Sequence, residues 1–217
     1  MRGLLEKDFR LMTGRKQTLL LFAAIAIVMG ISTDGSFIVG YLTFLCSLLS
    51  ISSIAYDEAD NGYAFLMTLP VTPKLYVREK YFFCAFTCFC AWIVSVILMF
   101  ILNFIKKVPS DLTEDILMCL LIFPLFILFI DFMIPVQLKF GVERGRIIFA
   151  CFGGIICAAI FIFSKIIPEP KAVSNLFSAL GTHSFIAVLL MITFAAAVVF
   201  TWLSLRISTK IMTDKEY

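Results

Sequence analysis

Charged residues are scarce in this 217-residue sequence: they make up 15% of it, whereas apolar residues make up 61%. Soluble domains contain about a quarter charged and about half apolar residues, so the composition excludes an ordinary soluble domain. The charges are clustered between apolar runs of about 20 residues, the length that crosses a bilayer as a helix. The composition therefore predicts an all-α, polytopic membrane protein made of one transmembrane domain, residues 1–217.

Residues that carry metal or catalytic chemistry are also missing. The chain has one histidine, His183, and none of its seven cysteines forms a C-x-x-C pair, which favours buried, reduced thiols. No group has the spacing of a metal site. The sequence also lacks the G-x-x-x-x-G-K-[ST] loop that binds nucleotide phosphates. We therefore expect no enzyme and no bound metal or cofactor. We also expect no nucleic-acid partner, because membrane topology explains the distribution of the net charge of +3 better.

Six apolar segments are long enough to be transmembrane helices. They cover approximately residues 17–33, 36–56, 81–105, 116–138, 147–167 and 184–205. Fourteen of the 18 lysines and arginines lie in the N-terminal lead, the two loops at 57–80 and 139–146, and the C-terminal tail. The positive-inside rule places these basic segments, and with them both termini, in the cytoplasm.

The N-terminal lead, residues 1–16, has the pattern of an amphipathic helix. Its apolar sector contains Leu4, Leu5, Phe9, Leu11 and Met12. Asp8 is the one charged residue on that sector. We expect this helix to lie in the cytoplasmic membrane interface, although a solvated basic leader is the alternative.

The 57–80 loop combines charged, aromatic and helix-breaking residues. Asp60-Asn61-Gly62 predicts a turn after the second span, and residues 63–69 suit a short helix. Thr72-Pro73 then favours a new helix, with threonine as the N-cap and proline at the first helical position. The short helix would expose aromatic residues such as Phe65 to the cytosol, where either a partner protein or interfacial lipid would cover them.

One acidic residue lies in the middle of a span. Asp131 is in the fourth span, at a depth where a charged side chain costs about 2.5 kcal/mol or more. Pro135 follows four residues later and leaves the carbonyl of Asp131 without its helical donor. Two interpretations stay open: Asp131 and Pro135 form a pathway or gating site, or Asp131 is a protonated acid hydrogen-bonded to a neighbouring span.

Small residues form two stripes on predicted helices. The stripe in the second span contains Gly40, Thr43, Ser47 and Ser50, and the stripe in the fifth contains Ala150, Gly154 and Ala158. Such residues let helices approach closely, so we expect packing within one subunit or between two, in preference to a substrate path.

Several motifs resemble one transporter family. NGYAFLMTLPVTPKLYVREKY, residues 61–81, resembles the first cytoplasmic loop of type-2 ABC transporter permeases, in the branch of small six-span bacterial subunits. KFGVERGRII, residues 139–148, resembles the second cytoplasmic loop, and LLEKDF resembles the interfacial starting helix. The matching loop positions are Asn61, Gly62, Tyr63, Leu66, Leu69, Pro70, Val71, Thr72, Lys80 and Tyr81. Pro73 departs from the pattern, because the family often has a basic residue there.

The resemblance implies a dimer of six-span permease subunits, identical or related, in the bacterial plasma membrane. A separate ATP-binding subunit, which would carry the ATP and Mg, would dock on the 57–80 loop as on a coupling helix. The docking residues would be Tyr63, Phe65, Leu66, Leu69, Pro70 and Lys80. The implied activity is export of an amphipathic or hydrophobic cargo, such as a peptide or an antibiotic.

Two other classes of protein remain as alternatives. An ATP-independent channel or ion-coupled carrier would use Asp131, but such carriers usually contain more than one ionisable group within the membrane. A membrane scaffold or regulator would keep the docking loop and would need neither Asp131 nor a transport path.

Overall fold

The computed structural model describes residues 2–32, 35–59, 62–68, 71–106, 112–166 and 182–215. Its helices are α1 (Arg2–Gly14), α2 (Lys16–Ser32), α3 (Gly35–Glu58), α4 (Gly62–Thr68), α5 (Pro73–Lys106), α6 (Leu112–Ile166) and α8 (Thr182–Asp214). The described residues contain no strand, which confirms the all-α prediction.

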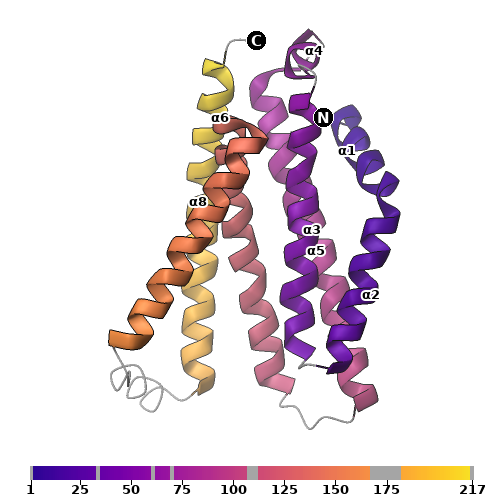
Figure 1. Ribbon diagram of the computed structural model, residues 1–217, viewed down its shortest axis with the longest axis vertical. Helices are drawn as coiled ribbons and strands as arrows, with labels where there is room; N and C mark the ends of the chain where they lie inside the picture. Colours follow the sequence, from indigo (N-terminus) through magenta and orange to yellow (C-terminus); the bar gives the residue numbers. More distant parts are fainter. Residues whose placement is uncertain are drawn as a thin grey trace.

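The long helices run along the long axis of the molecule (Figure 1). Both termini, the short helix α4 and the middle of α6 lie at the same end, which we call the terminal end. The prediction that the termini share one side with the 57–80 and 139–146 segments therefore agrees with this arrangement. That this side is the cytoplasm stays a prediction.

Four described helices are long and apolar enough to cross a membrane by themselves: α3 from Phe37, α5, the 115–141 part of α6, and α8 from Ile186. Helix α2 passes the same test only together with α1, from which it is bent by 60°, and this pair would make a fifth span. The predicted span 147–167 falls on the second arm of α6, where many side chains lie outside the described part. The total of six spans stays a prediction.

The lead helix forms as expected and packs against the protein. The ring of Phe9 lies 5.3 Å from that of Phe83 on α5 in an edge-to-face contact. Leu4 is buried in the same core cluster, near the terminal end, as residues of α3, α4, α5, α6 and α8. Part of the apolar face of α1 is therefore covered by the bundle.

The start of α5 follows the predicted capping pattern. The backbone N–H of Leu75 donates to the hydroxyl of Thr72 at 3.3 Å and to its carbonyl at 2.9 Å, directly before the helix that begins at Pro73. The short helix α4 also forms, and it begins at Gly62. A side chain could not replace this glycine easily, because a Cβ atom there would lie 2.6 Å from the carbonyl oxygen of Asp57.

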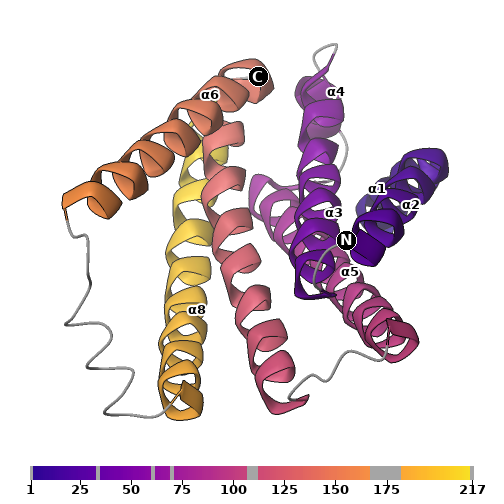
Figure 2. The same ribbon diagram turned by 60° about the horizontal axis from the view of Figure 1, so that its bottom comes forward.

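The prediction of a loop at 139–146 was wrong. Helix α6 continues through these residues and is interrupted at one residue only, Gly141. Gly141 has φ 78° and ψ 170°, a conformation essentially restricted to glycine, and helical structure resumes directly after it. A Cβ atom there would also lie 2.5 Å from a carboxylate oxygen of Glu58. The second arm of α6, residues 142–166, leaves this break at an angle to the first arm, residues 112–140 (Figure 2).

The glycines that permit close packing are not the ones that the stripes predicted. A Cβ atom at Gly40 or at Gly154 would meet no atom within 4 Å, so neither is a close-packing position within this chain. A role for Gly154 between two subunits stays a prediction. Besides Gly62 and Gly141, the tight positions are Gly30 and Gly35, where a Cβ atom would come within 2.2 Å of Ile38 and 2.5 Å of Asn103, respectively.

Replacing Gly141 by alanine should destabilise the fold, and the same change at Gly154 should not. The positive φ and the nearby Glu58 give Gly141→Ala an expected cost of about 1–3 kcal/mol. Gly154→Ala meets open space within a helix and gains up to about 1 kcal/mol of helix propensity. Thermal unfolding in detergent, followed by tryptophan fluorescence, would measure both, and equal shifts of the midpoint would contradict the assignment.

Candidate functional site

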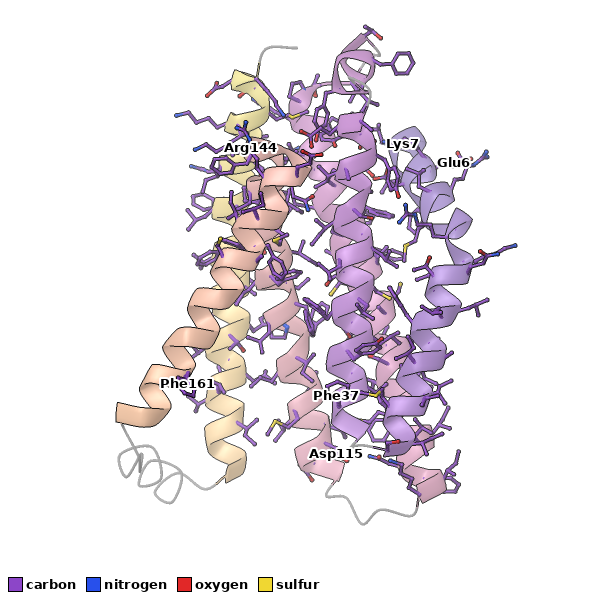
Figure 3. The ribbon with its side chains drawn as sticks, in the orientation of Figure 1. Glu6, Lys7, Phe37, Asp115, Arg144 and Phe161 are labelled. Carbon is purple, nitrogen blue, oxygen red and sulfur yellow. The ribbon has the colours of Figure 1, made fainter. Side chains whose placement is uncertain are left out.

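Four charged residues meet near the terminal end of the bundle, and we call them the buried ion cluster: Lys7, Asp8, Asp57 and Lys80. Lys80 on α5 and Asp8 on α1 are fully buried, and Asp57 on α3 is 5% exposed. Only Lys7 reaches solvent, and it lies on the side of α1 that faces α3, whereas Glu6 points away (Figure 3). The cluster therefore joins three helices.

Lys80 uses all three of its N–H donors inside the cluster. It binds the carboxylates of Asp8 and Asp57, the latter at 2.7 Å, and donates to the hydroxyl of Ser53 at 3.1 Å. Asp57 also accepts hydrogen bonds from Lys7 and, at 3.0 Å, from the hydroxyl of Tyr76. A buried charge is tolerated when its hydrogen-bonding capacity is filled in this way.

A further carboxylate lies next to this cluster without the same compensation. Glu79 is fully buried, and neither of its carboxylate oxygens accepts a hydrogen bond from the residues that the structure describes. With Glu79 included, three buried carboxylates face two lysines. This junction of α1, α3 and α5 therefore contains one buried carboxyl group that no hydrogen bond within the described residues compensates.

Helix α4 exposes one aromatic side chain and buries two of its apolar residues. Phe65 is 68% exposed, whereas Tyr63 and Leu66 are buried in the core. The ring of Tyr63 meets that of Tyr76 edge to face at 5.9 Å, so α4 contacts a residue that binds the buried ion cluster. Lys215 lies over the other side of this region, 4.7 Å from the Tyr63 ring.

This geometry separates the predicted docking residues into three groups. Phe65 is available to a partner. Tyr63, Leu66 and Lys80 are covered by the protein itself. The expectation that Lys80 contacts a partner directly is therefore wrong, because its ammonium group is buried and forms ion pairs with Asp8 and Asp57. Leu69 and Pro70 lie outside the described residues.

Asp131 is nearly fully buried and faces α8. Its carboxylate accepts a hydrogen bond of 2.6 Å from the hydroxyl of Thr201. Its backbone carbonyl, which Pro135 deprives of a helical donor, accepts one from the hydroxyl of Ser204. Of the two interpretations of Asp131, this arrangement matches the hydrogen bond to a neighbouring span, and a pathway role stays untested.

The hydroxyl of Ser204 also connects α8 to α5. The phenol of Tyr81 lies 2.5 Å from Ser204 and 2.9 Å from Ser208. Since Ser204 uses its one hydrogen on the carbonyl of Asp131, Tyr81 must donate to Ser204 and accept from Ser208. These residues form a continuous hydrogen-bond chain from α5 through α8 to α6.

The polar stripe of α3 faces α5. Ser50 lies 2.6 Å from the hydroxyl of Thr87, and Thr43 lies 3.4 Å from that of Ser95. Ser47, between them, is fully buried and donates to its own helix at the carbonyl of Phe44, at 2.7 Å. The stripe therefore lies in a contact between two helices of the same chain.

Sequence reasoning missed most members of these polar groups. Asp8 was visible as a charge on an apolar helix face, and that is a signal for a buried partner. Asp57 and Tyr76 are separated from Asp8 by about 50 residues or more, so no local pattern links them. Thr201 and Ser204 look like ordinary small polar residues of a transmembrane helix.

A model of the ABC-2 family transporter protein matches residues 3–213 of the chain. The chain belongs to the ABC-2 transporter family. The match covers α1 to α8, and it confirms the family resemblance of the loop motifs. No curated protein and no solved structure matches the sequence.

As an ABC-2 permease, the chain is a transport subunit of an ABC transporter and not itself a catalyst. The described residues contain no group of three or more histidine, cysteine or acidic residues that could hold a metal ion. The two polar groups described above, the buried ion cluster and the Asp131 chain, each connect three helices.

The different compensation of Lys80, whose donors are all used, and of Glu79, which accepts no hydrogen bond from the described residues, predicts opposite outcomes for substitutions at these two adjacent positions of the permease. Lys80→Met should cost about 3–5 kcal/mol of unfolding free energy, because it leaves Asp8 and Asp57 buried with one lysine fewer. Glu79→Gln should leave stability unchanged or raise it, because it removes a buried carboxylate without hydrogen-bond partners in the described part. Denaturation in detergent measures both, and a loss in Glu79→Gln as large as in Lys80→Met would refute this difference in compensation.

Ser204 should matter more to stability than the charge of Asp131. Ser204→Ala removes the donor to a buried carbonyl and the acceptor of Tyr81, at an expected cost of about 1–3 kcal/mol. Asp131→Asn keeps an oxygen that accepts from Thr201, so its unfolding midpoint should stay near that of the wild type. A larger loss in Asp131→Asn would mean that an ionised carboxylate is required there.

Proposed function

We propose that this chain is the permease subunit of an ATP-driven exporter, and that a separate ATP-binding subunit docks on α4. The observation that carries the proposal is Phe65, a 68% exposed aromatic residue on a short helix whose Tyr63 and Leu66 are buried. An exposed aromatic ring at the centre of a small rigid element is the kind of residue that fills a pocket on a protein partner. ATP and Mg would be bound by that partner.

The contacts below α4 support a mechanical role for it. Tyr63 rests on Tyr76, whose hydroxyl binds Asp57 in the buried ion cluster. Displacement of α4 by a partner would therefore act on α3, α5 and, through Asp8, on α1. Packed elements of this kind respond as rigid bodies, so ATP-driven motion of the partner would re-orient whole helices.

The remaining parts of the proposal concern assembly and cargo. We infer a second permease subunit, identical or related, and a location in a bacterial plasma membrane with both termini in the cytoplasm. The cargo is an amphipathic or hydrophobic compound, such as a peptide or an antibiotic. The apolar spans and the family resemblance support this class of cargo. An ion-coupled carrier is less well supported, because Asp131 is engaged by Thr201.

Phe65→Asp should release the ATP-binding subunit and leave the permease folded. The substitution places a charge where the partner would need an apolar contact, and it does not disturb the core because Phe65 is exposed. The measurement is co-purification of the tagged full-length chain with its ATP-binding subunit in detergent. We expect at least a tenfold loss of that subunit, equivalent to about 1.4 kcal/mol.

Two further variants make this result interpretable. Phe140→Asp is a matched control, since Phe140 is also an exposed aromatic residue, 43% exposed, next to the break in α6. It should retain the ATP-binding subunit. Leu66→Asp should instead reduce the yield of folded protein, because Leu66 is buried. Full retention of the partner by Phe65→Asp would refute docking on α4.

A further inference from the structure

A second surface of the terminal end has a composition that α4 docking does not explain. Helix α8 and the end of the first arm of α6 enclose a hollow between them, and Phe65 is not among the residues that line it. It is lined by Leu138, Lys139, Ile207, Lys210, Ile211, Asp214 and Lys215, and we call it the α6–α8 groove. Its floor is apolar, and three of its seven lining residues are lysines.

The lysines of the groove lack carboxylate partners. Within the part of the chain that the structure describes, Lys139, Lys210 and Lys215 form no ion pair, although Asp214 lies in the same groove. Lys215 is held in place, because it donates to the carbonyl of Leu138 at 3.3 Å. Three cations facing one carboxylate attract an anion.

The exposed face of α8 changes from apolar to basic residues close to the α6–α8 groove. From Val198 to Leu203 its exposed large residues are apolar or aromatic, and Trp202 is 54% exposed. One turn further, the guanidinium of Arg206 lies 3.9 Å from the Trp202 ring, and Lys210 follows after another turn. A tryptophan followed by basic residues is typical of the level where acyl chains end and headgroups begin.

We propose that the α6–α8 groove binds the headgroup of an anionic phospholipid. The phosphate lies between Lys139 and Lys210, and the upper part of an acyl chain lies on the exposed side of Ile207. A soluble anion would use the lysines but gain nothing from the apolar floor. A lipid uses both, and its position follows from the change of character along α8.

The proposed lipid site lies between the first arm of α6 and helix α8, at the terminal end of the bundle. Lys139 lies two residues before the break at Gly141, and Lys210 belongs to α8. An anion bound by both lysines would hold the end of the first arm of α6 against α8. Anionic lipid should therefore stabilise the folded chain as well as bind to it.

The test is lipid binding by the full-length chain, measured by native mass spectrometry after release from nanodiscs of phosphatidylglycerol and phosphatidylcholine. We expect the wild type to retain phosphatidylglycerol preferentially, and Lys139→Gln/Lys210→Gln to bind it about 25-fold more weakly, from roughly fivefold per lysine. Asp214→Asn should bind more tightly, because it removes the one carboxylate of the groove.

The matched control removes two charges at the same end but outside the groove. Lys74→Gln/Arg78→Gln changes exposed residues in the first turns of α5 and should leave phosphatidylglycerol retention unchanged. An equal loss in both double variants would show diffuse attraction by the basic end and would overturn the proposal. Equal retention of phosphatidylcholine by the wild type would overturn it as well.

Two further arms identify the occupant. Ile207→Asn should weaken phosphatidylglycerol binding, and glycerol 3-phosphate should compete poorly, if the acyl chain contributes. Full competition by glycerol 3-phosphate would show a site for soluble phosphate and would refute the lipid assignment. Loss of the ATP-binding subunit or of a second permease chain from Lys139→Gln/Lys210→Gln, with lipid binding unchanged, would make the groove a protein interface and would also refute it.

Discussion

The ammonium group of Lys80 is the interaction on which the terminal end of this permease depends. It lies where α1, α3 and α5 meet, and its three donors go to Asp8, Asp57 and Ser53. Burying the lysine without these acceptors would cost several kcal/mol of folding free energy, and so would burying the two carboxylates without the lysine. The position of the lead helix and the packing below α4 therefore depend on one another.

The two polar groups bind helices in different ways. The buried ion cluster uses full charges and lies near the end of the bundle, whereas the Asp131 chain lies deeper and relies on hydroxyl groups. Hydroxyl donors suit the membrane interior, because a hydroxyl group connects helices without carrying a charge itself. Pro135 has a compensating donor in Ser204, so the proline is accommodated without leaving a buried carbonyl unsatisfied.

The parts of the fold that depend on local patterns were predictable. The apolar runs located the helices, the Thr72-Pro73 pair located the start of α5, and Asp60-Asn61-Gly62 placed α4 to within a residue. The parts that depend on contacts between distant residues were not. Lys80 resembled a surface lysine of a loop because its partners are 23 to 72 residues away. A loop was expected at 139–146, and the structure has a break at Gly141 alone. The sequence did not show this difference, because a glycine is compatible with both a turn and a helix kink.

The break at Gly141 has a geometric consequence for the rest of α6. The second arm extends 25 residues beyond it, to Ile166, or about 37 Å at the rise of an α-helix. A rotation of about 10° at this residue's two dihedral angles would move the far tip by about 6 Å. Small adjustments near the termini are thereby amplified into large displacements at the opposite end, with no helical hydrogen bond broken along the arm.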